Sequence, residues 1–281
     1  MTENDYITSP SGVRCPRILY GTAWKKLQTE GLVRQAIQLG FRGIDTACQP
    51  KHYHEAGVGA AIATCLNEGL TRAELYLQTK FTPVSGHDPN QVPYDPGARP
   101  AEQVTQSFKV SLRNLQTSYL DCLVLHSPLA NAGNTNEVWQ AMEAVVDAGA
   151  ARQLGISNCY SLETLETLYR SARIKPAVVQ NRFYAQTGYD REIRAFCKQR
   201  GIIYQSFWTL TANPHVLAHD KVTSLASKYR RTPAQILFRY LTQIDVVPLT
   251  GTTSQQHMRE DLQIFEFRLT DSERDALTPL F

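Results

Sequence analysis

A carboxylate, a phenol and two imidazoles lie close together between residues 40 and 61, in the stretch GFRGIDTACQPKHYHEAGVGAA. They belong to Asp45, Tyr53, His52 and His54. The stretch begins like a buried strand and ends like a helix, so these groups fall at the exit of an apolar strand. Groups of these types transfer protons to and from reacting molecules. A single tyrosine at a strand end is ordinary packing, and a catalytic interpretation therefore needs matching groups elsewhere in the chain.

Polar and aromatic residues also end other short apolar runs of the chain. The runs predicted as strands span residues 17–22, 41–47, 75–80, 120–127, 151–158, 177–183, 201–207 and 245–251. Their ends carry Gly21, Thr22 and Trp24, then Asp45, Lys80, His126, Ser157 with Asn158, Gln180 with Asn181, Phe207 with Trp208, and Thr250 to Thr253. A purely structural core has no need of Asp, Lys and His at these positions, because an unpaired buried charge is costly.

Each of these residues alone has an ordinary structural explanation. A strand-end lysine such as Lys80 is usually solvated, and a histidine such as His126 is often a satisfied core residue. Asp45 suits a helix cap, Tyr53 suits packing, and the threonines before Ser254 suit the start of the next helix. The catalytic interpretation therefore depends on a fold that brings all the strand ends to one place.

Segments with helical periodicity separate the apolar runs, for example at 101–116, 136–149 and 161–170. Capping boxes and exit glycines mark further helix boundaries at Thr232 with Gln235, Thr270 with Glu273, Gly149 and Gly201. Eight strand–helix units predict an α/β fold, a closed (β/α)8 TIM barrel formed as one domain over residues 1–281. The segment around residues 9–12 is expected to form a turn or hairpin that closes the barrel bottom. An open doubly wound sheet is the alternative, although no GxGxxG follows the first strand.

Composition and charge exclude several classes of function. The chain has 281 residues, of which 42% are hydrophobic and 20% charged, as in ordinary globular proteins. A net charge of +3 without a basic run argues against nucleic-acid binding. No segment reads as a signal core or a membrane span. The six cysteines have no CxxC or zinc spacing, so we expect free thiols, no metal site and a cytoplasmic location.

Several motifs occur in order between Ile18 and Phe267. They are GTAW at 21–24, GIDTA at 43–47, EAGVG two residues after Tyr53, LQTK ending at Lys80, LVLHSP around His126, GISN at 155–158, VVQNRF around Gln180, and VVPLTGTTSQQHMRED at 246–261. With these motifs the sequence resembles the aldo-keto reductase family. The resemblance implies a TIM barrel, an extended NAD(P)H cofactor without a Rossmann domain, and a catalytic tetrad that falls on Asp45, Tyr53, Lys80 and His126.

The chemistry of carbonyl reduction fits those four residues. Reduction places a hydride on carbon, which the cofactor supplies, and a proton on oxygen. Tyr53 is the expected general acid, and Lys80 is expected to lower its pKa from the usual value near 10. Asp45 is expected to pair with Lys80 and hold it charged. His126, as a neutral imidazole, would orient the substrate oxygen, so that Tyr53 and His126 together stabilise a developing alkoxide.

The resemblance also implies which residues hold the cofactor and the substrate. The expected cofactor contacts are Gly21, Thr22, Asp45, Ser157, Asn158, Gln180, Phe207, Leu210, Thr250, Gly251, Thr252, Thr253, His257 and Asp261. The expected substrate contacts are Trp24, Tyr53, His126 and Trp208, which with the loop around Tyr94 suggest an aromatic pocket for a small-molecule aldehyde or ketone. NADPH is the expected cofactor, with NADH as the alternative.

The tyrosine position departs from the family pattern. Tyr53 follows Asp45 by eight residues, rather than the five of typical members, and CQPKH fills the longer turn. Tyr53 is still assigned because EAGVG comes soon after it. His52 and His54 are alternative acids or substrate contacts, or ordinary loop residues at the mouth.

Three further departures concern the cofactor and the pocket rim. Phe207 stands where a tyrosine usually stacks on the nicotinamide, and it retains the stacking face. Leu249 replaces a common lysine and His257 a common arginine, so we expect NADPH to be preferred by less than in members with a full basic clamp. The chain stops soon after its last predicted helix, so the pocket is expected to be open or covered by residues 82–100.

Two other functions stay open at this level. One is a specialised biosynthetic reductase acting on an imine or enone, and the other is a cofactor-binding redox sensor on the same fold. The sequence determines neither the physiological substrate, the oligomeric state nor the direction of the reaction in the cell.

Overall fold

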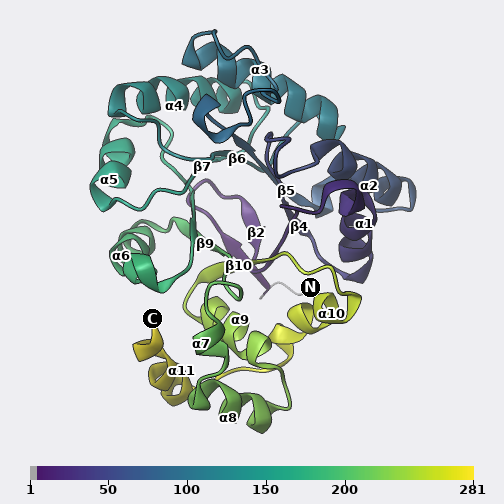
Figure 1. The fold of residues 1–281 in the computed structure, drawn as a ribbon, viewed down its shortest axis with the longest axis vertical. Helices are drawn as coiled ribbons and strands as arrows, with labels where there is room; N and C mark the ends of the chain where they lie inside the picture. The colour runs from purple at the N-terminus through teal and green to yellow at the C-terminus, as the bar shows by residue number, and fades with distance from the viewer. Residues whose placement is uncertain (1–4) are drawn as a thin grey trace.

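Eight parallel strands form a closed barrel in the computed structural model, which describes residues 5–281 (Figure 1). Residues 1–4, part of the polar N-terminus in which we expect no signal core, lie outside the described residues. The barrel strands are β3 (Leu19–Gly21), β4 (Gly43–Asp45), β5 (Tyr76–Phe81), β6 (Cys122–Leu125), β7 (Leu154–Ser157), β8 (Val178–Arg182), β9 (Ile203–Phe207) and β10 (Val246–Thr250). Because β10 pairs with both β9 and β3, the predicted (β/α)8 barrel is confirmed and the open doubly wound alternative is wrong.

Helices cover the outside of the barrel and connect its strands. They are α1 (Thr29–Leu39), α2 (Glu55–Asn67), α3 (Pro100–Leu115), α4 (Ala132–Asp147), α5 (Leu162–Ser171), α6 (Arg191–Arg200), α7 (Pro214–Leu217), α8 (Asp220–Tyr229), α9 (Pro233–Gln243), α10 (Gln255–Leu262) and α11 (Asp271–Leu277). The predicted capping boxes at Thr232 and Thr270 are present at the starts of α9 and α11. Gly201 ends α6 with φ 68°, a left-handed conformation that glycine adopts without strain.

An antiparallel hairpin closes the N-terminal end of the barrel, as predicted. Its strands are β1 (Tyr6–Thr8) and β2 (Arg14–Pro16). Val13 and Cys15 pack into an apolar cluster with the inward-facing residues near the strand starts. Ser9 Oγ donates a hydrogen bond of 2.5 Å to Gln153 Oε1, which ties the turn of the hairpin to the barrel.

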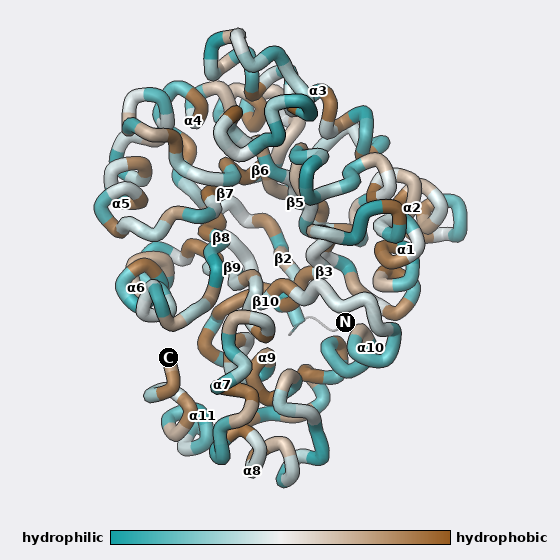
Figure 2. The backbone as a smooth tube through the Cα atoms, in the orientation of Figure 1, coloured by the Kyte–Doolittle hydropathy of each residue, from teal (hydrophilic) through white to brown (hydrophobic). Residues whose placement is uncertain are grey.

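The barrel interior has two layers of different character. The lower layer is apolar and contains Val13, Cys15, Leu19, Tyr76, Cys122, Val124, Val178, Ile203 and Val247, and Leu249 of the same cluster reaches the cavity wall. Above it the inward-facing side chains are polar and buried: Asp45, Gln78, Lys80, Gln180 and Gln205. Figure 2 shows hydrophobic stretches in the barrel strands and in the helices around them. The fold therefore buries a polar cluster near the C-terminal ends of the strands.

The segment 82–100 is ordered, but it does not place an aromatic ring in the pocket as we expected. Tyr94 is buried, with its ring centroid 5.6 Å from that of Phe81, and its hydroxyl donates to Thr82 O at 2.6 Å. The prediction that Tyr94 contributes to the pocket was wrong, because Tyr94 packs in the core beneath the segment. The segment contributes Thr82 and Gly86 to the cavity wall.

Candidate active site

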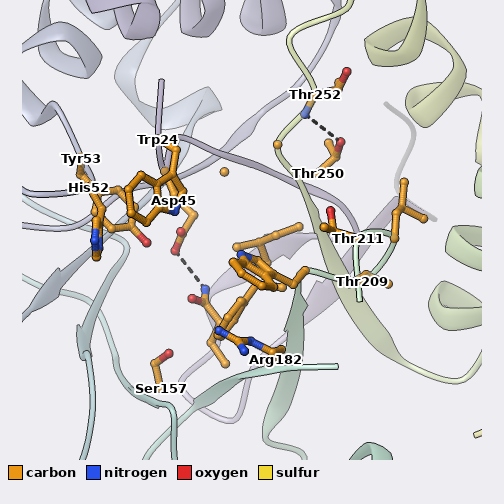
Figure 3. A pocket seen from close by; sticks show the side chains of 18 of the residues that line it. Trp24, Asp45, His52, Tyr53, Ser157, Arg182, Thr209, Thr211, Thr250 and Thr252 are labelled. Atoms are coloured by element: carbon orange, nitrogen blue, oxygen red, sulfur yellow. Dashed lines mark hydrogen bonds between the residues drawn. The ribbon is translucent and has the colours of Figure 1, made fainter. Parts of the chain in front are cut away.

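A cavity of about 810 Å³ opens at the C-terminal ends of the barrel strands. The predicted residues on its wall are Gly21, Trp24, Asp45, Tyr53, His126, Ser157, Asn158, Gln180, Phe207, Trp208, Leu210, Thr250, Gly251, Thr252, His257 and Asp261. Figure 3 shows Trp24, His52 and Tyr53 on one side and Thr250 with Thr252 on the other. Within residues 5–281, none beyond Asp261 lies on the wall, so the C-terminal residues do not cover this cavity.

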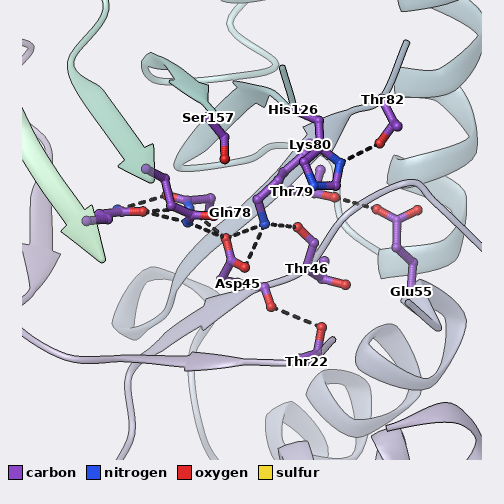
Figure 4. Close-up of polar contacts among 12 residues, drawn as sticks. Thr22, Asp45, Thr46, Glu55, Gln78, Thr79, Lys80, Thr82, His126 and Ser157 are labelled. Carbon is purple, nitrogen blue, oxygen red and sulfur yellow. Dashed lines mark hydrogen bonds and ion pairs between the residues drawn. The ribbon is translucent and has the colours of Figure 1, made fainter. Parts of the chain in front are cut away.

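Asp45 and Lys80 form a buried ion pair beneath the cavity floor. Lys80 Nζ donates to Asp45 Oδ1 at 2.7 Å and to Oδ2 at 2.6 Å, and also to Thr46 O at 2.9 Å (Figure 4). Burial acts to lower the pKa of Lys80, but Asp45 and the Tyr53 phenol outweigh it, and the net pKa lies above the usual value. Lys80 is therefore a charged ammonium at physiological pH.

A network of three buried glutamines holds the Asp45 carboxylate. Gln78 Nε2 and Gln180 Nε2 donate to Asp45 Oδ1 at 2.7 and 3.0 Å. Both amides also donate to Gln205 Oε1, at 2.9 and 2.8 Å. With Lys80 included, Asp45 Oδ1 accepts three hydrogen bonds, which fixes its orientation toward the ammonium.

The longer turn after β4 folds back so that Tyr53 returns to the ion pair. Within the turn, Tyr53 N donates to Gln49 O at 3.0 Å. Glu55, in the first turn of α2, accepts from Thr79 Oγ1 at 2.6 Å, and Thr79 immediately precedes Lys80. This contact ties the helix start to strand β5 and places Lys80 Nζ 5.3 Å from the centre of the Tyr53 ring.

The net pKa shift of Tyr53 is opposite to the one expected from the sequence. Burial raises the pKa of the phenol above 10, while Lys80 opposes this shift and Asp45 adds to it. The expectation counted the neighbouring cation but not the loss of water around the hydroxyl. Tyr53 is therefore protonated at physiological pH, which is the state that donates a proton.

His126 faces Tyr53 and is neutral. The two ring centroids are 6.0 Å apart with the planes at 69°. Burial, with the nearby charge of Lys80 and the other histidines, holds the pKa of His126 well below its usual range. His126 Nδ1 shares a hydrogen bond of 2.7 Å with Thr82 Oγ1, which leaves Nε2 for another partner.

The two histidines that flank Tyr53 have different surroundings. His52 lines the cavity and packs on Trp24, with ring centroids 3.9 Å apart. Burial, together with Lys51, lowers the pKa of His52, so this imidazole is uncharged at neutral pH. His54 is exposed, precedes α2, and lies away from the cavity wall. The placement supports Tyr53 over either histidine as the group facing His126.

The opposite end of the cavity combines backbone donors with few charges. Helix α10 begins beside Thr252, and Ser254 Oγ accepts from His257 N at 3.3 Å as its cap. Asp261 accepts from Thr250 Oγ1 at 2.7 Å, and burial raises the pKa of this carboxyl to about 7. Lys25, beside the same turn, donates to Gly251 O at 2.6 Å, and burial lowers the pKa of its ammonium to about 8.

Two predicted cofactor residues do not lie on the wall. Thr22 is fully buried and donates to Asp45 O at 3.0 Å, so its hydroxyl supports β4. Thr253 is exposed on the outside of the turn before α10. Both residues lie in turns that follow barrel strands, where a motif match does not determine which way a side chain points.

Sequence reasoning missed several residues of the site, namely Lys25, Gln78, Arg182, Gln205 and Glu260. Arg182 and Glu260 line the cavity, and Lys25, Gln78 and Gln205 support its residues. Alternation along strands contained a signal for three of them. Gln78 is two residues before Lys80, Gln205 is two before Phe207, and Arg182 is two after Gln180, so each shares a strand face with a predicted residue.

Three of the nine non-glycine residues with positive φ among residues 5–281 lie on the cavity wall. Trp24, Asn158 and Trp208 have φ values of 65°, 51° and 56°, in the left-handed region that asparagine tolerates and tryptophan rarely occupies. Each follows the end of a barrel strand and lines the cavity. Strain of this kind persists where the surroundings enforce it and is common at functional sites.

The family model for the aldo/keto reductase family matches residues 20–280. The chain belongs to the aldo/keto reductase family. The chicken (Gallus gallus) aldo-keto reductase family 1 member A1 is 27% identical over 96% of this chain and 86% of its own length. The glyoxal reductase of Bacillus subtilis is 30% identical over 88% of this chain and 82% of its own. A crystal structure of an aldo/keto reductase from Brucella melitensis superposes with a TM-score of 0.82 at 26% identity, covering 98% and 99% of the two chains.

Membership of the aldo/keto reductase family makes the chain an oxidoreductase of carbonyl compounds, and family members generally use nicotinamide cofactors. The wall suits an extended dinucleotide. Ser157, Asn158 and Gln180 contribute amide and hydroxyl groups to the wall, Phe207 contributes an aromatic ring, and residues around the start of α10 line another part of it. Among residues 5–281, no helix has the length and apolar character that a membrane crossing requires.

Proposed function

We propose that this protein is an NADPH-dependent reductase of aldehydes or ketones, with Tyr53 as its general acid. The observation that carries the proposal is the placement of a protonated Tyr53 and a neutral His126 across one cavity, above the Asp45–Lys80 pair. A bound nicotinamide would supply the hydride. Tyr53 and His126 Nε2 would donate to the carbonyl oxygen, and Tyr53 would deliver the proton.

Lys80 and Asp45 act on Tyr53 electrostatically in this proposal. The ammonium makes the phenol more acidic than burial alone would leave it. Asp45 keeps Lys80 charged, and the buried glutamines keep Asp45 aimed at the ammonium. The sequence alternatives, reduction of an imine or enone and redox sensing, gain no separate support from the geometry.

The proposed preference for NADPH rests on the α10 end of the cavity. Thr252, the N–H groups that begin α10, and nearby Lys25 are suited to a phosphate. Leu249 provides no charge there, and Asp261 provides a carboxyl. We therefore expect NADPH to be favoured over NADH by a modest factor. Six free, buried cysteines support the proposal of a cytoplasmic location.

The deciding experiment measures oxidation of NADPH with a panel of aldehydes and ketones, extended to one enone and one cyclic imine. Tyr53→Phe should lower kcat by about 10²-fold or more, the usual scale for a lost general acid. Quenching of protein fluorescence by NADPH should be retained, which separates chemistry from cofactor binding. His52→Ala and His54→Ala are the matched controls. If either control abolishes reduction while Tyr53→Phe stays active, the assignment is wrong.

A further inference from the structure

Arg182 is a cation on the cavity wall with no ion-pair partner in the described chain. It is the last residue of β8, and it is the sole Lys or Arg on the wall among residues 5–281. No carboxylate in this part of the chain lies within ion-pair distance of it, and its buried Nε has no hydrogen-bond partner. A buried guanidinium donor without an acceptor is costly, so an acceptor atom of a ligand in the cavity would stabilise it.

Aromatic contacts hold the guanidinium in place without satisfying its donors. Its central carbon lies 4.1 Å from the Trp208 ring centre and 5.3 Å from that of Tyr184. Trp208, which stacks on the guanidinium, has φ 56° and is 47% exposed. The rings offer π faces rather than lone pairs, so the N–H groups stay free for a carboxylate or phosphate.

The position of Arg182 relates it to the reaction centre. Arg182 lies two residues beyond Gln180, whose amide contacts Asp45, and alternate residues of a strand share a face. At about 3.3 Å per residue, the Arg182 backbone is about 7 Å nearer the mouth. Figure 3 places Arg182 between the Trp24–Tyr53 side and the threonines at the other end. A ligand that reaches both Tyr53 and Arg182 carries an anionic group in addition to its carbonyl.

We infer that Arg182 recognises an anionic group, a carboxylate or a phosphate, and that the carbonyl substrate supplies it. This inference rests on the proposed function and names its substrate class as anionic aldehydes or ketones. The cofactor diphosphate carries the same chemistry and is the competing source. If Arg182 binds the cofactor diphosphate, replacing Arg182 should change NADPH affinity. If it binds an anionic substrate, replacing it should change substrate preference.

The test compares carboxylate substrates with their uncharged methyl esters. The pairs are 4-formylbenzoate with its methyl ester, and 4-oxobutanoate with its methyl ester. For wild type we expect the kcat/KM ratio of acid to ester to exceed one in at least one pair. Arg182→Gln should lower that ratio ten-fold or more through the KM of the acid, the scale of one charge-assisted contact. Arg182→Lys should retain part of the preference. Arg170→Gln, which removes an exposed arginine of α5, should keep the wild-type ratio.

Other results would overturn the inference. An unchanged ratio in correctly folded Arg182→Gln contradicts it, with folding checked by circular dichroism and thermal melting. A ten-fold loss of NADPH affinity with an unchanged ratio assigns Arg182 to the cofactor diphosphate instead.

Binding without turnover separates the inference from the proposed function. Calorimetry with 4-hydroxybutanoate, compared with 1-butanol, measures anion recognition in wild type and Arg182→Gln. Binding of the acid that is lost in the variant supports the inference even if no carbonyl is reduced. Reduction of the esters without anion selectivity supports the proposed function and refutes the inference.

Discussion

Replacement of Lys80 by Met tests whether its charge sets the acidity of Tyr53. Lys80 Nζ lies 5.3 Å from the Tyr53 ring centre. At an effective dielectric constant of 20, one charge at this distance is worth about 3 kcal/mol, or about 2 pKa units. Asp45, which raises the pKa of Tyr53, is present in both wild type and the variant, so its contribution does not change. We expect the pKa of Tyr53 to rise by about two units, relative to wild type, when Lys80 is lost.

The assay is alcohol oxidation with NADP⁺ between pH 6 and 10. In this direction Tyr53 acts as a base and has to lose its proton first. A higher phenol pKa therefore moves the rise of kcat/KM to higher pH in Lys80→Met. Reduction at pH 7 should also slow, because the weaker acid donates its proton less readily. Normal turnover with an unchanged pH profile would refute the electrostatic role of Lys80.

The double variant Asp45→Asn with Lys80→Met is the matched control. Lys80→Met alone leaves a buried carboxylate without its cation, and loss of one partner costs about 3–5 kcal/mol of stability. Removing both charges should recover part of this loss in a thermal melt. It should also give a smaller pH shift than the single variant, because the two charges act on Tyr53 in opposite directions. An equal or larger shift in the double variant would contradict this account.

Two further predictions concern cofactor choice and packing. Because the pKa of Asp261 is about 7, its carboxyl becomes charged above that pH, and the NADPH to NADH ratio of kcat/KM should fall between pH 6 and pH 8. Asp261→Asn should flatten that dependence; a slope identical to wild type would exclude the carboxyl as its cause. Gly59→Ala should lower the melting temperature strongly, because its Cβ would lie 2.0 Å from Asn114 O, whereas Gly31→Ala, with no atom within 4 Å, should raise it slightly. Equal melting temperatures for the two variants would contradict the close contact.

Local sequence patterns were sufficient to predict the barrel. Each of the eight apolar runs coincides with one barrel strand, with β5 extending one residue past its run to Phe81, because buried parallel strands need continuous apolar residues. The capping boxes at Thr232 and Thr270 mark helix starts for an equally local reason, since cap and partner are three residues apart. Parallel strands in a closed barrel bring their C-terminal ends together, and this rule alone predicts that Asp45, Lys80 and His126 lie near one another.

Long-range contacts decided what local patterns could not. Tyr94 turned out to be a core residue because Phe81 and Thr82 lie beside it. The glutamine network around Asp45 joins side chains of β5, β8 and β9, and no local spacing in the sequence indicates that their amides meet.

The sign of the Tyr53 pKa shift also belongs to the tertiary structure. Sequence names the charged neighbours, whereas depth of burial and distance determine which influence is larger. For Arg182, too, the sequence and the tertiary structure each determine one part. Its place two residues after Gln180 is a property of the sequence, and its lack of an acceptor follows from every element packed around it. The sequence thus determined which groups gather at the barrel mouth, and the packing of the whole chain decided their charge, orientation and unmet hydrogen bonds.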